Sequence, residues 1–219
     1  MIIEVCAESY EYAVNAEKAG ADRIELCKDL HFDGLTPDYD DAKNTINKLN
    51  IPVFILIRPR EGGFVYSNEE FELMKQDIIK FKEMGCKGIV SGVLNEDKTV
   101  DLGRTKELVE LTRPLEFTFH RAFDKIINPI KGLEELIEIG SNRILTSGQE
   151  DSAINGIKLI EKLIKIAANR ITIMPGSGVK SVNIKEFIAV GANEIHGSFS
   201  NNKLITEKEK VEEVVSCFN

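Results

Sequence analysis

The sequence predicts a (β/α)₈ barrel, and three observations carry this prediction. Eight short β-rich segments alternate with segments of helical periodicity, and this alternation is typical of parallel sheets with crossover helices. A short pattern in which glycine precedes a β-rich run recurs at Gly20, Gly85, Gly140 and Gly191. No linker or composition break divides the 219 residues. We therefore expect one barrel domain over 1–219, and an open doubly wound sheet is the alternative.

The eight expected strands begin at the N-terminus and recur along the whole chain. They span residues 2–6, 23–27, 52–58, 88–92, 115–120, 143–146, 170–174 and 194–198. Each repeated glycine follows an amphipathic segment, which indicates a helix that ends in a left-handed residue before the next strand. Dividing 219 residues among eight units (219/8) gives about 27 residues each. The loops must therefore be short and the barrel compact.

Helix signals are clear in three of the intervening segments. The segments 67–84 and 152–168 place apolar residues on one helical face. Ser67, with a glutamate three residues later, forms a capping box at the start of the first of them. Thr206, also with a glutamate three residues later, predicts a capping box for a last helix.

Composition and charge exclude several classes of function. The chain has 28 Lys+Arg against 36 Asp+Glu, a net charge of −8, which argues against binding nucleic acid through a basic face. No apolar run approaches the ~18 residues of a membrane helix, so we expect no membrane partner. The N-terminus reaches Glu4 without a basic leader, unlike a signal peptide. The four cysteines are therefore expected to be reduced thiols in the cytoplasm.

Alternation within the strands predicts a polar barrel interior. Successive side chains of a strand point to opposite faces, and the strands over 2–6, 23–27, 115–120 and 194–198 each have one apolar and one polar face. We expect the apolar faces to pack under the helices and the polar faces to point inward. Buried ionisable groups are costly unless paired. The groups expected to pair with one another are Glu4, Glu25, Arg58, His120, Glu194 and His196.

Arginines at strand ends predict a site for a small anionic substrate. Arg58 and Arg60 follow the third strand and precede two glycines, and Arg121 follows the fifth strand. Guanidinium groups bind carboxylate or phosphate through charge-assisted, forked hydrogen bonds. Barrel enzymes place their chemistry at this end of the strands. The alternative is a surface loop with a salt bridge to Glu61.

A histidine at the end of the fifth strand is a candidate general acid/base. His120 occupies this position, and Asp124 is a carboxylate close to it in sequence. Histidine titrates near neutral pH, and a carboxylate can orient its ring. Glu4 or Glu25 would act as base or orienting group. The alternative is a core histidine that is bonded to Glu25 or Glu194.

The loops after the last two strands are candidate anion-binding loops. Ser177 and Gly178 follow the seventh strand, and His196 and Ser198 end the eighth. Barrels often bind phosphate with these two loops and a helix N-terminus, although two ordinary βα turns would look the same. We expect lyase or isomerase chemistry by analogy of fold and no nucleotide cofactor.

Two cysteines at neighbouring strand ends are candidate metal ligands. Cys6 and Cys27 face inward by parity, and neighbouring parallel strands lie ~4.8 Å apart. Two soft thiolates suit Cu(I). The alternatives are a disulfide, which is unexpected in the cytosol, and two inert buried thiols. Cys86 and Cys217 are expected to be packing residues.

Motifs spread along the chain occur in the order of a known family. They are residues 4–6 (EVC), 20–27 (GADRIELC), 34–37 (GLTP), 58–60 (RPR), 64–67 (FVYS), 118–124 (TFHRAFD), 143–148 (RILTSG) and 195–196 (IH). With them the chain resembles the CutC family of copper homeostasis proteins over nearly its whole length. The resemblance implies a cytoplasmic TIM barrel, a dimer or larger homo-oligomer, and a link to copper tolerance. It also implies that the family's copper-ligating cysteine pair falls on Cys6 and Cys27.

Two hypotheses of different classes follow. The first is a cytosolic copper homeostasis protein that binds Cu(I) through Cys6 and Cys27. The second is a barrel enzyme that acts on a small anionic, phosphorylated or carboxylated substrate. In that enzyme the strand-end arginines would bind the anion and His120 would move a proton.

Overall fold

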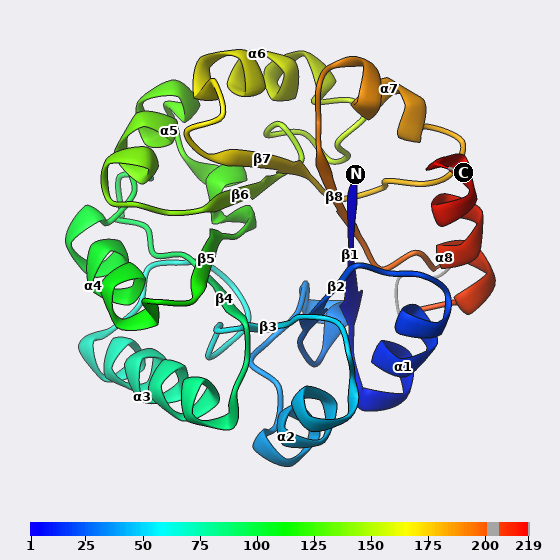
Figure 1. The fold of residues 1–219 in the computed structure, drawn as a ribbon. Helices are drawn as coiled ribbons and strands as arrows, with labels where there is room; N and C mark the ends of the chain where they lie inside the picture. The colour runs from blue at the N-terminus through cyan, green and yellow to red at the C-terminus, as the bar shows by residue number, and fades with distance from the viewer. Residues whose placement is uncertain (201–205, 219) are drawn as a thin grey trace.

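Eight parallel strands form a nearly closed barrel in the computed structural model, which describes residues 1–200 and 206–218 (Figure 1). The strand order is β7-β6-β5-β4-β3-β2-β1-β8, and β7 lies beside β8. The strands are β1 (Ile2–Ala7), β2 (Arg23–Leu26), β3 (Val53–Leu56), β4 (Gly88–Ser91), β5 (Glu116–Phe119), β6 (Arg143–Thr146), β7 (Thr172–Pro175) and β8 (Glu194–Gly197). All eight overlap the strands that the sequence predicts.

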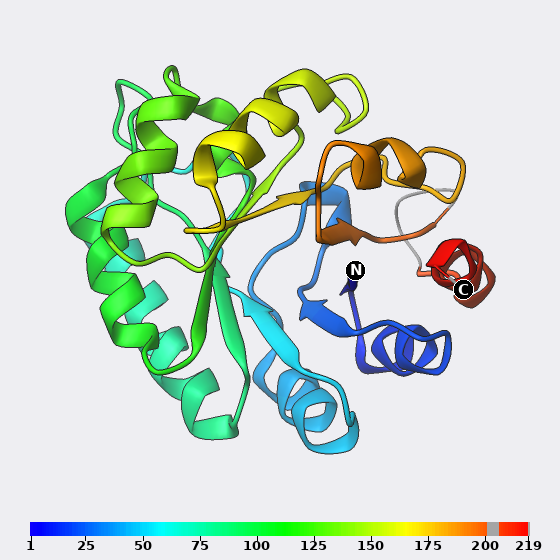
Figure 2. The same ribbon diagram turned by 45° about the horizontal axis from the view of Figure 1, so that its top comes forward.

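A ring of helices surrounds the strands, as the tilted view also shows (Figure 2). The helices are α1 (Tyr10–Lys18), α2 (Tyr39–Lys48), α3 (Asn68–Met84), α4 (Leu102–Thr112), α5 (Pro129–Glu138), α6 (Ile157–Ala167), α7 (Ile184–Ala189) and α8 (Lys208–Val215). Short 3₁₀ segments follow β2, β5 and α8: η1 (Leu30–Phe32), η2 (Arg121–Lys125) and η3 (Ser216–Phe218). The four repeated glycines all have positive φ, which confirms the predicted left-handed turns.

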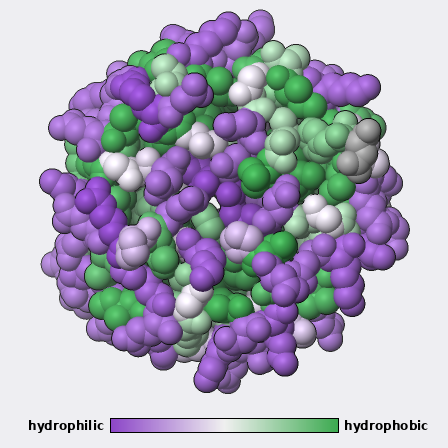
Figure 3. Space-filling view, viewed as in Figure 1, coloured by the Kyte–Doolittle hydropathy of each residue, from purple (hydrophilic) through white to green (hydrophobic). Residues whose placement is uncertain are grey.

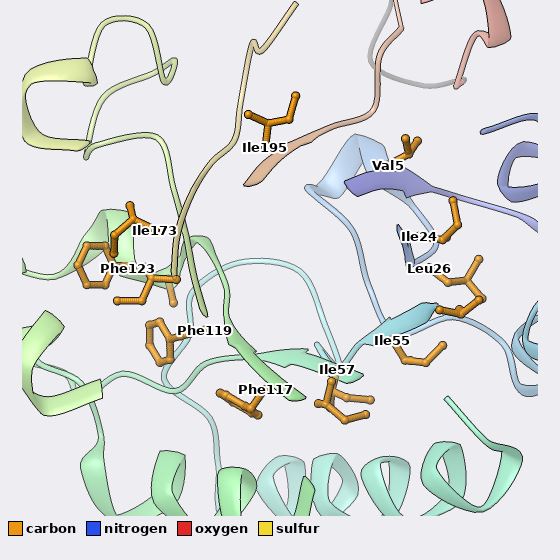
Figure 4. Close-up of a cluster of buried hydrophobic side chains, with 14 of the residues drawn as sticks. Val5, Ile24, Leu26, Ile55, Ile57, Phe117, Phe119, Phe123, Ile173 and Ile195 are labelled. Atoms are coloured by element: carbon orange, nitrogen blue, oxygen red, sulfur yellow. The ribbon is translucent and has the colours of Figure 1, made fainter. Parts of the chain in front are cut away.

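The apolar and polar faces of the strands separate as alternation predicts. Val5, Ile24, Phe117 and Ile195 are buried in the main hydrophobic core on the outer side of the barrel. Figure 4 shows these side chains and their neighbours directed toward the helices. The inner side has a much smaller apolar cluster, which consists of Cys6, Cys27, Phe54, Leu56 and Val90. Most of the remaining interior is polar.

Two helix boundaries differ from the sequence prediction. The segment 152–168 becomes helical at Ile157, because residues up to Gly156 form turns and Gly156 packs against Gly148. The last helix begins after Glu207, and Thr206 does not cap it. The Thr206 hydroxyl instead donates a hydrogen bond to the carbonyl oxygen of Cys6 at 3.1 Å. The capping box at Ser67 is present as predicted.

No helix among the described residues is long and apolar enough to cross a membrane.

Candidate functional site

A layer of ion pairs crosses the barrel near the N-terminal ends of the strands. Arg23 on β2 donates to Glu4 on β1, with an Nε–Oε2 distance of 2.5 Å, and its Nη2 donates to Glu194 on β8. Both carboxylates are almost inaccessible to solvent. A buried charge is tolerated when it is paired and hydrogen-bonded, and this requirement explains why Arg23 reaches two strands at once.

A second arginine continues the layer to the opposite side of the barrel. Arg143 on β6 donates to Glu194 at 2.7 Å, to Glu116 at 2.9 Å and to Thr118 at 3.3 Å. The guanidinium groups of Arg23 and Arg143 lie over the ring of Phe54, at 4.8 and 5.4 Å from its centroid. The layer therefore joins strands on opposite sides of the barrel, and we name the set Arg23, Arg143, Glu4, Glu116 and Glu194 the ion-pair layer.

A hollow of about 620 Å³ opens at the N-terminal ends of the strands, and the ion-pair layer lies at its base. Arg23, Arg143, Glu194 and Phe54 are among its lining residues. Hydrophilic residues surround the opening over the barrel axis (Figure 3). The hollow is thus at the opposite end of the barrel from the predicted site residues. Chemistry in barrels sits at the carboxyl ends of strands, so we do not assign the function to this hollow.

The two predicted metal-binding cysteines lie in contact at the other side of the layer. The Sγ atoms of Cys6 and Cys27 are 3.4 Å apart, and both thiols are free and buried. Phe54, Leu56 and Val90 surround them. The Sγ contact and burial raise the pKa of Cys6 well above its usual value. The contact with Cys6 lowers the pKa of Cys27, but burial and the nearby acidic side chains together outweigh it, and the pKa is raised.

His196 lies between the Cys6 thiol and two buried carboxylates. Its Nδ1 lies 2.7 Å from Glu4 Oε1, and its Nε2 lies 3.6 Å from Glu25 Oε2. Burial disfavours the imidazolium, but Glu25, Cys6 and Glu4 raise the pKa of His196 well above its usual value. Burial also raises the pKa of Glu25. Burial opposes ionisation of Glu4, yet Arg23 and His196 lower its pKa to about 2.

His120 occupies a separate place at the mouth of the barrel. Its Nδ1 accepts a hydrogen bond from the backbone N–H of Ala122 at 3.3 Å. The ring packs against Phe64, with 4.8 Å between the ring centroids. Burial and the charge of Arg58 lower the pKa of His120 to about 3. Among the described residues neither Glu25 nor Glu194 bonds to this ring.

The arginines at the mouth have different surroundings. Arg58 is buried and donates to the carbonyl oxygens of Phe32 and Gly34, at 2.6 and 2.8 Å. Arg60 donates to Glu70 at 2.5 Å and to backbone carbonyls of its own loop. The alternative of a salt bridge to Glu61 is therefore wrong for Arg60, whose partner is Glu70. Arg60 thus holds the loop that follows β3, and Arg58 joins this loop, through Gly62 at 3.0 Å, to the loop that follows β2.

Asp124 and Arg121 organise the loop that follows β6. Asp124 accepts hydrogen bonds from Arg121 Nε at 2.9 Å, from the Ser147 backbone N–H at 3.0 Å and from the Gln149 N–H at 3.2 Å. It also accepts from the Thr146 hydroxyl. Arg121 remains half-buried. Asp124, which lies in η2, thus uses its carboxylate to hold the backbone that follows β6.

The predicted anion-binding loops lie at the same end of the barrel. Ser177 has positive φ and donates to the Asp151 carbonyl oxygen at 3.0 Å. Gly178 also has positive φ, and Ser198 is half-buried at the end of β8. Their role in binding an anion stays a prediction.

Comparison with known proteins decides the family. The sequence model of the CutC family matches residues 1–201.

The chain belongs to the CutC family.

Relatives in this family are similar over most of their length. A CutC protein of Photorhabdus laumondii is 44% identical over 204 residues, which cover 93% of this chain and 82% of that protein. The human copper homeostasis protein cutC homolog is 46% identical over 198 residues, which cover 90% of this chain and 72% of the human protein. These identities confirm the resemblance that the sequence motifs indicate.

Solved structures agree with the CutC barrel. The putative copper homeostasis protein CutC of Streptococcus agalactiae has a TM-score of 0.86 and 33% identity, and covers 90% of this chain and 98% of that one. An aldolase named QR15 has a TM-score of 0.71 over 99% of this chain and 94% of that one. At 16% identity the aldolase shows a shared fold alone.

Sequence reasoning missed the two arginines of the ion-pair layer. Arg23 shares the parity of Glu25 and Cys27, and Arg143 occupies the same position of the glycine repeat as Arg23. Both residues begin a strand that a repeated glycine precedes by three positions. Counting parity from the first residue of each strand would have placed both guanidinium groups inside this CutC barrel.

Proposed function

We propose that this CutC family chain binds Cu(I) through Cys6 and Cys27 as part of copper homeostasis. The observation that carries the proposal is the 3.4 Å contact between the two Sγ atoms. Both thiols are free, and a disulfide would require about 2.05 Å. The family names of the relatives point to copper independently of this contact.

The donor chemistry of the pair fits Cu(I). Thiolates are soft ligands that select Cu(I) over hard cations. With metal–sulfur bonds of about 2.3 Å, a separation of 3.4 Å corresponds to a bent S–metal–S arrangement. A small outward movement of either side chain would widen this angle. The apolar residues Phe54, Leu56 and Val90 keep water from the sulfurs.

Charge near the sulfurs supports the same conclusion. Two thiolates and one Cu(I) carry a net charge of −1. The imidazole of His196 contacts Cys6, and its raised pKa favours the imidazolium, which offsets that charge. Because the metal must displace the thiol protons, binding releases protons.

Replacement of both cysteines by serine tests the proposal. Anaerobic titration of reduced protein against a chromogenic Cu(I) chelator should give one ion per chain for the wild type. The Cys6→Ser/Cys27→Ser variant should bind Cu(I) more weakly by about 100-fold or more, since hydroxyls are poor ligands for soft ions. The matched control is Cys86→Ser, which alters a buried thiol outside the pair. Equal affinity in the double variant and the wild type would contradict the proposal.

A second candidate function, an enzyme that acts on a small anion, is favoured by one observation. Five buried side-chain polar atoms have no hydrogen-bond partner within residues 1–200 and 206–218. Three of them belong to the segments that follow β3 and β5: Arg58 Nε, Tyr66 Oη and His120 Nε2. His120 accepts at Nδ1, so its neutral ring carries the proton on Nε2. The Arg58 Nε–H is a donor and the Tyr66 hydroxyl can act as one, so a substrate oxyanion or carbonyl would satisfy the three groups. This reading makes His120 a hydrogen-bond donor, as neutral imidazoles are in some barrel enzymes.

The protonation state of His120 gives this reading a direct test. Its folded pKa of about 3 lies below the ordinary value of about 6.5. Such a group contributes stability above pH 6.5 that is lost as the pH falls toward 3, with a slope of up to about 1.4 kcal/mol per pH unit. We expect His120→Gln to remove this slope. Urea unfolding between pH 7.5 and pH 4.5 measures this slope. Parallel profiles for both proteins would show that His120 takes up a proton in the folded protein as readily as in the unfolded chain, which would contradict a neutral, buried ring.

A further inference from the structure

Beyond the proposed Cu(I) pair, the barrel contains a second set of atoms that have the type and spacing of metal ligands. Cys6, Glu25 and His196 each offer one ligand atom, and these atoms all lie within 4.8 Å of one another. The three residues come from β1, from β2 and from β8, which are neighbours in the sheet. Their side chains converge because Cys6 pairs with Glu25 in the strand register, and Glu4 pairs with His196.

The geometry points to a site for a divalent ion of the zinc class, bound by Cys6 Sγ, a Glu25 oxygen and His196 Nε2. We propose this site as distinct from the Cu(I) pair, although the two share Cys6. Nitrogen, oxygen and sulfur ligands on Zn²⁺ lie at about 2.0–2.3 Å, so the edges of a tetrahedral site are about 3.3–3.8 Å. The 3.6 Å between His196 Nε2 and Glu25 Oε2 matches such an edge, and it exceeds the usual length of an N–H···O hydrogen bond.

The surroundings of His196 orient it as a metal ligand. Glu4 Oε1 lies 2.7 Å from Nδ1, so Nδ1 holds a hydrogen and Nε2 is the ring atom left for a metal. Arg23 holds Glu4 in turn, through a 2.5 Å hydrogen bond. A carboxylate on the second ring nitrogen is the usual support of a metal-ligating histidine, because it fixes the tautomer and the ring orientation.

Charge and donor type select the ion. One thiolate, one carboxylate and one neutral imidazole carry a formal charge of −2, which a divalent cation neutralises inside the barrel. Binding would release the thiol proton of Cys6 and the Nε2 proton of His196 to solvent. A mixed set of sulfur, nitrogen and oxygen suits Zn²⁺, whereas Cu(I) prefers two sulfurs. Three protein ligands leave a fourth position open, as in zinc sites that act on a water or substrate.

Cobalt(II) is the probe for this site, because its visible bands report tetrahedral geometry and its near-ultraviolet band reports a thiolate ligand. Titration of reduced, metal-free protein should give both signals, and Zn²⁺ should abolish them. We expect His196→Gln and Glu25→Gln each to weaken Co²⁺ binding by about 100-fold or more. Cys27→Ser should retain Co²⁺ binding within about threefold while it weakens Cu(I) binding.

These measurements can therefore contradict either proposal without contradicting the other. Loss of the cobalt bands in Cys27→Ser together with their retention in His196→Gln would overturn the divalent site and leave the two-sulfur site standing. Normal Co²⁺ binding in a protein without Cu(I) affinity would overturn the two-sulfur site and leave the divalent site standing. Circular dichroism checks that each variant is folded. X-ray absorption of the zinc-loaded wild type needs no variant: one sulfur with nitrogen and oxygen neighbours is expected, and two sulfurs or none would overturn the proposal.

Discussion

Arg23→Met should destabilise the protein by about 3–5 kcal/mol, the usual result of removing one partner from a buried ion pair. The substitution leaves Glu4 without its 2.5 Å hydrogen bond and removes one of the two arginines that bind Glu194. Methionine fills much of the space of the arginine stem, so lost volume is a minor contribution. Urea unfolding at pH 7.5, monitored by circular dichroism, gives the free energy of unfolding.

A matched surface pair and a pH series distinguish a buried-charge effect from general damage. Arg170 binds Glu134 through two hydrogen bonds on the surface, and Arg170→Met should change stability far less, because solvent screens the pair. In the wild type the lowered pKa of Glu4, about 2, gives stability that is present above pH 4.5 and lost below it. In Arg23→Met, protonation of Glu4 removes its unpaired buried charge. The difference in the free energy of unfolding between the two proteins should therefore narrow as the pH falls. A constant difference would contradict this account.

Gly148→Ala should destabilise the protein by about 3 kcal/mol, through left-handed strain and overpacking together. Gly148 has a φ of +69°, and an added Cβ would overlap the carbonyl group of Gly156. The atoms that the added Cβ would meet are backbone atoms, so no side-chain rotation can relieve the overlap. The loop after β6 would shift, and with it the contacts of Asp124 and Arg121. Thermal and urea unfolding measure the loss.

Gly63→Ala is the control for this substitution. An added Cβ at Gly63 meets nothing within 4 Å, so stability should stay within about 0.5 kcal/mol of the wild type. Equal stability of Gly148→Ala and Gly63→Ala would show that the loop after β6 adapts to the extra atom.

The barrel was predictable because its signals are local. Strand alternation, capping at Ser67 and glycines such as Gly85 each depend on a few adjacent residues. The start of α6 and the cap of α8 could not be predicted, since each depends on a contact with residues outside the helix. Gly156 packs on Gly148, and Thr206 bonds to Cys6, 200 residues away. A hydroxyl that satisfies a distant carbonyl gives the same sequence pattern as one that caps a helix.

The positions of the candidate site residues could be predicted from the sequence, but most of their interaction partners could not. Parity placed Cys6, Cys27 and His196 inside the barrel, and the structure brings them together. The partners of Arg60 and His120 could not be deduced, because loop conformation brings Glu70 and backbone carbonyls to Arg60 and the Ala122 N–H to His120. The unpartnered state of His120 Nε2 is likewise a property of the packed fold.

The ion-pair layer spans the interior of the barrel from one side to the other. Its cross-links run from β1 and β2 through β8 to β5 and β6, so charged side chains lie between the 620 Å³ hollow and the two sulfurs. If Cys6 and Cys27 bind Cu(I) as proposed, the ion would therefore reach and leave the two sulfurs through the rim of loops at the carboxyl ends of the strands.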